Sequence, residues 1–283
     1  MKTILQDWLR LLRLSLRFRA VSMAALLLAS GCALLHKRPP YHDPDRLVSV
    51  VKVAPAGEAP IRGADFLALR SESKTLEPIA AYVYKPFILT EREPERIDSV
   101  QVTADFFPTL GVNPVLGRAL VPDDSKPDSN PVVVISHTLW LRRFGADPNL
   151  IGRTLTLDRE RRTVVGIMPP DFQFPKDCNA WTPLASDFLD FKLVLERKNT
   201  SIGVEVEVFA RLKPGVTLQQ AQADISLITS KLEGDRPENN FGRDIKLNAL
   251  RESSIQKENF KGNVLEIKIR PPAKPSVETG KEK

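Results

Sequence analysis

The chain has 283 residues, of which 42% are hydrophobic and 27% are charged, a composition typical of folded proteins with a sizeable core. Its formal net charge of +6 comes entirely from residues 1–38, where seven basic side chains accompany a single acid, Asp7. The remainder is neutral, which argues against a nucleic-acid partner. The two cysteines, Cys32 and Cys178, are too few for a disulfide framework or a four-ligand zinc site.

Residues 1–38 are predicted to target the chain to a membrane. An uncharged run of 16 residues, from Ala20 to Leu35, follows an arginine-rich stretch, which is the layout of a signal sequence or a membrane anchor. A spanning helix needs at least about 17 apolar residues, so the run is marginal as a transmembrane helix. Upstream, apolar residues recur at helical spacing among arginines, which predicts a basic amphipathic helix on the cytoplasmic leaflet: Ile4, Leu5, Trp8, Leu9, Leu12 and Leu16.

The end of the apolar run, Leu28-Ala29-Ser30-Gly31-Cys32, resembles the lipobox of bacterial lipoproteins. This resemblance implies lipidation of Cys32, with cleavage after Gly31. Two other interpretations stay open: an uncleaved anchor helix, or a Cys32 that is simply a small buried side chain in a helix. On either membrane interpretation the positive flank stays inside and the bulk of the chain is exported.

The first part of the exported chain is predicted to form a strand-helix-strand unit. Prolines between residues 39 and 44 prevent a helix from continuing, and a β-branched strand follows at Leu47–Val53. A Pro/Gly-rich turn covers residues 54–60. An amphipathic helix at Gly63–Ser73 and a returning strand at Ile79–Tyr84 complete the unit.

A second unit of the same order is predicted far downstream. Residues Val204–Leu212 alternate between apolar and charged side chains, which indicates a half-exposed strand. Pro214-Gly215 makes a turn, Thr217 and Gln220 form a helix capping box, and Ile245–Leu250 closes the unit as a strand. The helix is expected to bury one stripe: Leu218, Ala221, Ile225, Ile228 and Leu232. The two units are expected to pack into one sheet-on-helix layer, which makes the segment between them an insertion.

The segment from about residue 112 to residue 184 has a different pattern. Val132–Ile135 reads as a short buried strand, and Ser136 caps a helix that carries Leu139, Trp140, Leu141 and Phe144 and ends at Gly145. Two strands, Thr154–Leu157 and Thr163–Ile167, are joined by a charged turn at residues 158–162. A hairpin-rich second lobe is therefore expected. Residues 251–283 are interpreted as a polar tail.

No set of residues predicts catalysis, metal binding or a cofactor. Ser136 and His137 are adjacent on a helix and point about 100° apart, so they cannot form a nucleophile-base dyad. Asp123 and Asp124 lie in a Pro/Asp/Ser turn, where Asp bonds local backbone groups. Cys178 is expected to be an incidental thiol in a polar loop, and Trp140 and Trp181 are expected to pack in the core. The three histidines, His36, His42 and His137, are scattered, and no Walker or Rossmann motif occurs.

Many short motifs resemble, in the same order, the MacB-like periplasmic core domain of bacterial ABC-transporter permeases, and the duplicated orphan permeases in particular. The resemblance runs from about Asp43 to Leu232. The motifs are DPDRLV at 43–48, DFLALR at 65–70, VTADFFPTLGV at 102–112, PVLGR at 114–118, VIS at 134–136, LW at 139–140, RFGADP at 143–148, IGRTL at 151–155 and VVGIMPPDF at 164–172.

The resemblance implies an α+β fold: a discontinuous porter-like lobe of two strand-helix-strand units with an inserted hairpin-rich second lobe, after an N-terminal membrane segment. The implied divisions are residues 1–38 for the amphipathic helix plus signal or anchor, 43–250 for the core domain and 251–283 for the tail. Within the core, the porter-like lobe takes residues 43–111 and 200–250, and the inserted lobe takes residues 112–199.

For function, the resemblance implies a non-catalytic module at the bacterial cell membrane, with the bulk of the chain periplasmic. Such domains relay conformational change from a cytoplasmic ATPase to extracytoplasmic substrates or partners, so ABC permease and ATPase subunits are the implied partners. The family continues into a transmembrane bundle, whereas the polar tail follows the core domain here. A truncated paralogue that partners a full permease is one expectation. A free-standing envelope lipoprotein that binds a ligand or partner is the alternative.

Overall fold

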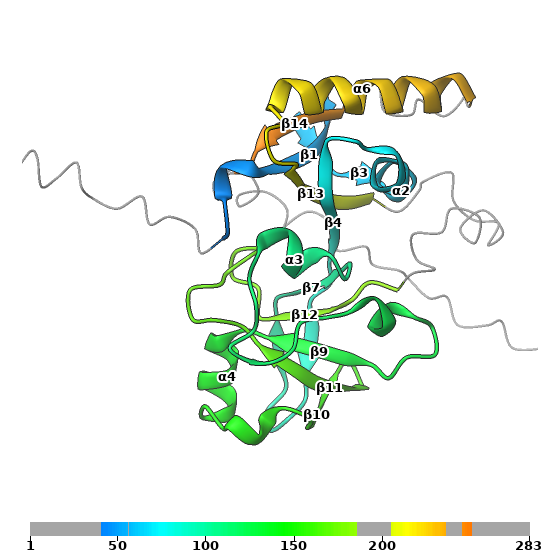
Figure 1. The fold of residues 1–283 in the computed structure, drawn as a ribbon. Coiled ribbons are helices and arrows are strands. Elements are labelled where there is room, and N and C mark those ends of the chain that lie inside the picture. Colours follow the sequence, from blue (N-terminus) through cyan, green and yellow to red (C-terminus); the bar gives the residue numbers. More distant parts are fainter. Residues whose placement is uncertain (1–40, 56, 186–204, 236–244, 251–283) are drawn as a thin grey trace, which may run out of the picture. The chain divides into compact units, whose positions relative to one another are not determined.

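The computed structural model describes residues 41–55, 57–185, 205–235 and 245–250, with no account of the side chains of residues 232–235. Within these residues one mixed sheet of 14 strands is the main element, and its principal path runs β14-β1-β13-β4-β7-β12-β9-β11-β10-β5-β6. Figure 1 labels the strands of this path from β14 to β10. The predictions for residues 1–38, for Cys32 and for the tail at residues 251–283 concern residues outside the described ranges.

Two strand-helix-strand units build one end of this sheet, as the sequence predicts. The first comprises β1 (Leu47–Ala54), α2 (Gly63–Glu72) and β4 (Leu76–Tyr84). The second comprises β13 (Glu205–Leu212), α6 (Leu218–Asp235) and β14 (Ile245–Ala249). The strands alternate in direction in the order β14-β1-β13-β4, so each unit encloses or flanks a strand of the other, as in split β-α-β folds. Short strands β2 (Gly57–Ala59) and β3 (Ile61–Arg62) pair with β1 and β13.

Both helices cover the same face of this four-stranded part. Phe66 and Leu69 of α2 and Ile225 of α6 pack in one buried cluster with alternate residues of the four strands, such as Val50 and Val208. Strand side chains alternate between faces, so the neighbouring residues turn to the opposite side. There Phe209 and Tyr82 join a second cluster, which is rich in aromatic residues.

The remaining strands contain both parallel and antiparallel pairs. The elements are β5 (Phe87–Leu89), β6 (Glu95–Ile97), β7 (Ser99–Val102), α3 (Phe106–Leu110), β8 (Leu116–Gly117), β9 (Val132–Ile135), α4 (His137–Phe144), β10 (Thr154–Leu157), β11 (Glu160–Ile167) and β12 (Ala180–Pro183), with single 3-10 turns at Pro44–Arg46, Pro122–Ser125 and Pro148–Leu150. The expected hairpin is present as β10–β11 and a further one as β5–β6. The parallel pairs β7–β12 and β9–β11 were not predicted.

A third buried cluster fills this part of the sheet. It joins Phe87 and Ile97 of the β5–β6 hairpin with Val133 of β9, Leu139 of α4 and Leu155 of β10. Strand β4 belongs to both ends of the sheet, because it pairs with β13 along its first residues and with β7 at Tyr82–Tyr84. The two ends are thus connected by continuous backbone hydrogen bonding.

Local signals for helix ends are confirmed. The Ser136 hydroxyl accepts a hydrogen bond from the backbone N–H of Leu139 at 3.1 Å, and Gly145 ends α4 with φ of 61°. Thr217 and Gln220 form the reciprocal capping box that precedes α6.

Four details of the sequence prediction are wrong. Strand β4 begins at Leu76, three residues before the predicted start. The turn before β11 contains only Asp158 and Arg159, both with positive φ as in tight hairpin turns, so β11 begins at Glu160. Leu218 is 39% exposed because it is the first residue of α6, ahead of the turn that meets the sheet.

The fourth concerns β13, which was expected to be half-exposed. From Val208 to Leu212 every residue is buried. Apolar and charged side chains alternate only in the first residues of β13, which is the end of the strand that reaches solvent. The rest lies centrally between β1 and β4, with helices on one face and the aromatic cluster on the other.

Candidate functional site at the start and end of the folded domain

The residues considered for chemistry in the sequence have structural partners. Besides capping α4, Ser136 is buried, while the His137 ring stacks edge-on against Trp140 with centroids 5.3 Å apart. The carboxylate of Asp124 accepts hydrogen bonds from both Nη atoms of Arg118, at 2.7 and 2.8 Å, and from the N–H of Val121 at 2.9 Å. Burial raises the pKa of Asp124, but the hydrogen bonds from Arg118 and Val121 outweigh it and hold that pKa below its usual value.

Cys178 lies in the loop before β12, as predicted, but this loop turns the Cys178 side chain inward. Its side chain is buried in the aromatic cluster, and its thiol donates to the carbonyl of Ala180 at 3.3 Å. Burial raises the pKa of this thiol far above its ordinary value, because a thiolate would be desolvated there. Trp181, in the same cluster, is fully buried as predicted, whereas Trp140 is only partly buried against the third cluster.

No group of His, Cys, Asp and Glu side chains that could hold a metal ion occurs in the described ranges. No helix within those ranges is long and apolar enough to cross a membrane.

An extended polar arrangement surrounds Arg211, at the end of β13. Its side chain is buried, and its guanidinium donates to backbone carbonyls: Nε and Nη2 to Thr109 at 3.0 and 2.8 Å, Nη2 also to His42 at 2.6 Å, and Nη1 to Asp43 at 3.1 Å. Thr109 lies in α3, and His42 and Asp43 lie where the described domain begins. One side chain therefore joins three segments that are far apart in the sequence.

A second arginine fastens the same place. Nε and Nη2 of Arg46 donate to the carbonyl of Leu212 at 2.9 and 2.7 Å, and its Nη1 pairs with the Asp43 carboxylate at 3.3 Å. The backbone N–H of His42 donates to the carbonyl of Leu110 at 3.1 Å. We call Tyr41–Asp43 the lead-in segment, and the set formed by it, Arg46, Arg211 and their carbonyl partners the arginine junction.

Gly111 allows the lead-in segment to approach α3. It ends α3 with φ of 68°, a conformation that favours glycine. A Cβ at this position would lie 2.5 Å from the Cβ of His42. The close contact between the lead-in segment and α3 therefore requires a glycine there.

The electrostatics of the junction are unusual, because two guanidinium groups lie close together. Burial lowers the pKa of Arg211, and the charge of Arg46 lowers it further, while Asp43 acts in the opposite direction. An arginine stays protonated under such shifts, so the charge is balanced by carbonyl dipoles. If the three segments separated, the buried cation would lose these carbonyl partners. The high free-energy cost of that loss holds the three segments together.

The domain also ends beside the place where it begins. Strand β14 pairs with β1, and the N–H of Leu250 donates to the carbonyl of Leu47 at 2.8 Å. Residues before Tyr41 and after Leu250 are thus connected to adjacent positions of the fold.

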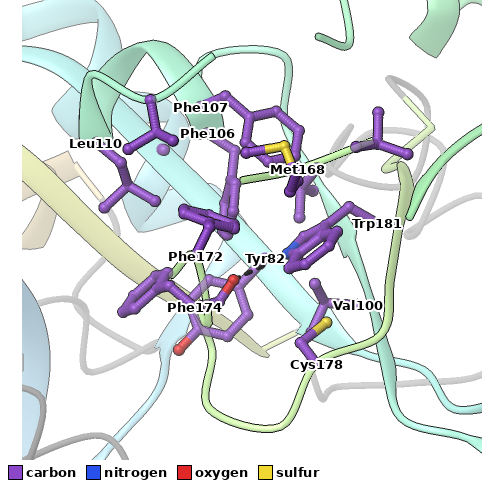
Figure 2. Close-up of a cluster of buried hydrophobic side chains, with 14 of the residues drawn as sticks. Tyr82, Val100, Phe106, Phe107, Leu110, Met168, Phe172, Phe174, Cys178 and Trp181 are labelled. Carbon is purple, nitrogen blue, oxygen red and sulfur yellow. Dashed lines mark hydrogen bonds between the residues drawn. The ribbon is translucent and has the colours of Figure 1, made fainter. Parts of the chain in front are cut away.

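The lead-in segment reaches the aromatic cluster directly. The Tyr41 ring meets Phe172 and Phe174 edge-on, with centroids 6.5 and 6.0 Å apart. Figure 2 shows the cluster beyond this contact, in which Phe174 and Trp181 lie around Tyr82. The Trp181 indole donates to the carbonyl of Phe174 at 2.9 Å, and Trp181 belongs to β12, which pairs with β9. Packed side chains therefore run from the junction into the second part of the sheet.

Sequence reasoning assigned no role to Arg46 or Arg211. A signal did exist for Arg211: a basic residue stands between Ala210 and Leu212 in an apolar run, and a buried cation of this kind needs partners. Its carbonyl partners come from residues more than 100 positions away, so they could not be read from the sequence.

These observations define the protein as a two-part α+β domain whose main polar site is a structural junction. The chain belongs to the MacB-like periplasmic core domain family, whose sequence profile matches residues 20–228. The family consists of periplasmic domains of ABC-transporter permeases and is not an enzymatic family.

Solved structures share the fold. The periplasmic region of MacB from Actinobacillus actinomycetemcomitans matches with a TM-score of 0.52 and 15% identity, over 76% of this chain and 92% of that one. A domain of a putative permease protein from Porphyromonas gingivalis matches with a TM-score of 0.53 and 18% identity, over 75% and 94% of the two chains. A search of curated proteins gave no match.

Proposed function

We propose that the chain is a membrane-anchored extracytoplasmic domain that acts without catalysis in an ABC-transporter assembly. In this proposal residues 1–38 hold the chain at the bacterial membrane, and the core, 43–250, lies in the periplasm. The proposed porter-like lobe takes residues 43–111 and 200–250, and the proposed inserted lobe, residues 112–199, packs against the β5–β6 hairpin of the first. A tail follows from residue 251. Membership of a family of permease periplasmic domains supports this placement.

The arginine junction supports this proposed function. A domain that relays movement from a membrane needs its membrane connection fastened to its core, because a loose linker would absorb the movement. Here Arg46 and Arg211 fasten the lead-in segment to β13 and α3, and Tyr41 connects it to the aromatic cluster. Displacement of the segment before Tyr41 would therefore be transmitted to both parts of the sheet.

Contact with an ABC permease or ATPase subunit is tested by purifying the tagged chain from its native envelope in mild detergent. We expect an ABC subunit to be identified by mass spectrometry in amounts comparable with the chain. Reproducible recovery of the chain without any ABC subunit would count against the proposal.

The lipobox-like run ending at Cys32 favours the second candidate, a free-standing envelope lipoprotein that binds a ligand or partner. The intact mass of the N-terminal peptide from membrane-extracted protein separates the two. An acylated Cys32 with residues 1–31 missing supports a lipoprotein, either free-standing or accessory to a transporter. An intact Met1 with unmodified Cys32 supports an uncleaved anchor and the permease plan.

A further inference from the structure

Strand β14 ends the sheet order, so within the described residues its outer edge has no strand neighbour. The pairing with β1 determines which backbone groups point outward. Leu250 bonds to Leu47, and hydrogen-bonded pairs alternate along an antiparallel ladder. The N–H and C=O groups of Ile245 and Leu247 therefore point away from β1.

One side chain bonds two of these four outward groups. The carboxamide of Gln222, on α6, donates through Nε2 to the carbonyl of Ile245 and accepts through Oε1 from the N–H of Leu247, both at 2.9 Å. An amide that donates and accepts in this way reproduces one residue of an adjacent strand. Gln222 is half-buried, and Figure 1 shows α6 running above β14. Within the described residues, Gln222 thus holds the carbonyl of Ile245 and the N–H of Leu247, and the backbone amides of an added strand could replace it there.

We propose that this edge is a docking site for an added strand, and that its occupant is residues 264–270 of the same chain. The apolar side chains Leu265, Ile267 and Ile269 alternate there with Glu266, Lys268 and Arg270. Strand β14 has the same alternation, with Ile245 and Leu247 buried and Lys246 exposed. An added strand would therefore turn its apolar residues toward the side that α6 covers.

The connection and the charges fit a hairpin. The chain leaves β14 at Leu250, and residues 251–263 give it ample length to return antiparallel to β14. The buried residues of β14 must lie opposite apolar residues of the added strand. Within residues 264–270, Lys246 faces an opposite charge only when it lies across from Glu266. That register places Leu247 opposite Leu265. Leu218, one helical turn before Gln222 and 39% exposed, lies on the same flank of α6, where the added strand would cover it.

Cysteine cross-linking of the full chain tests this register. We expect Lys246→Cys with Glu266→Cys to form an intramolecular disulfide under mild oxidation, because these residues face each other on the solvent side. The matched control, Lys246→Cys with Lys268→Cys, displaces one partner by two residues, too far for good disulfide geometry. The first pair should give about five-fold more disulfide or better, with peptide mapping used to exclude Cys32 and Cys178.

Gln222, which competes with the added strand for these backbone groups, gives a second readout. Gln222→Ala frees the carbonyl of Ile245 and the N–H of Leu247, so it should raise the yield of the first pair. Equal yields for the two cysteine pairs would overturn the proposal, since they would mean random collisions of the tail. Disulfides formed only between molecules would also overturn it, because the occupant would then be a second copy.

Discussion

At the scale of single residues, Cys178 illustrates how burial determines chemistry. Its thiol is enclosed by the aromatic cluster, and burial raises its pKa. We predict that N-ethylmaleimide labels Cys178 only after unfolding, as measured by peptide mass spectrometry with and without urea. A folded-state pKa above the unfolded one also means that the thiol's contribution to stability falls as pH rises above about 8.5. Rapid labelling of the folded protein at pH 7 would contradict this account.

A second prediction concerns the substitution of Arg211. Arg211→Lys keeps the charge but loses the fork that reaches the carbonyls of His42, Asp43 and Thr109 together. We expect the free energy of unfolding to fall by about 2 kcal/mol, as measured by urea denaturation. Amide exchange in the lead-in segment should rise as well.

The matched control for Arg211 is Arg153→Lys. Arg153 is exposed and pairs with Asp147 at 3.1 Å on the surface, so its replacement should change stability by less than about 0.5 kcal/mol. Similar losses for the two variants would mean that the junction contributes no more than a surface ion pair.

At the scale of secondary-structure elements, Asp224 fastens α6 to the turn between α2 and β4. Its Oδ2 accepts from the hydroxyls of Ser73 and Thr75, at 2.9 and 2.7 Å, and from the N–H groups of Lys74 and Thr75, at 2.9 and 3.2 Å. Burial raises the pKa of Asp224, but these hydrogen bonds outweigh it and lower that pKa. The contribution is therefore present above the unfolded pKa of about 3.9 and is lost as pH falls through the folded one.

We predict that Asp224→Asn lowers the free energy of unfolding by about 1–2 kcal/mol at pH 7, because this carboxylate is only partly exposed and accepts several bonds. The difference from the wild type should shrink at pH 3. Glu72→Gln is the control, since Glu72 pairs with the exposed Lys231 at 2.9 Å on the surface. Urea denaturation at both pH values measures the effect, and a loss that is independent of pH would contradict a role for the charge.

The ends of helices were predictable from the sequence where they depend on hydrogen bonds between neighbouring residues. The capping box of Thr217 and Gln220, the N-cap of Ser136 and the end of α4 at Gly145 each depend on residues within one or two helical turns. Contacts that tie elements together were not predictable. The partners of Arg211 and Gln222 lie 23 to 169 positions away, and the burial of β13 depends on which strands flank it.

At the scale of the whole molecule, the aromatic cluster connects the arginine junction to the second part of the sheet. Trp181 is fully buried and bonds to Phe174, whose ring meets Tyr41. We predict that Trp181→Ala lowers the free energy of unfolding by about 3–5 kcal/mol, because it leaves a large cavity. Trp181→Phe should lose less, since it keeps most of the ring. Two separate unfolding transitions in Trp181→Phe, with one unchanged, would show that the cluster does not join the two parts.

The family and the general plan of the fold were predictable, because many short motifs appear in family order between Asp43 and Leu232. The candidate site was not, because it is built from backbone carbonyls. Carbonyl acceptors occur at every residue, so the sequence alone cannot indicate which ones an arginine will find.

In the proposed function, the domain relays movement through the arginine junction. Hydrogen exchange of residues 41–46 and 205–212 tests this relay, measured in the proposed complex with an ABC-transporter subunit, with and without a non-hydrolysable ATP analogue. We expect nucleotide to change the hydrogen exchange of both peptides, and Arg211→Lys to reduce the change in residues 205–212. Identical exchange in the two states, in a complex that demonstrably binds the nucleotide, would contradict the claim.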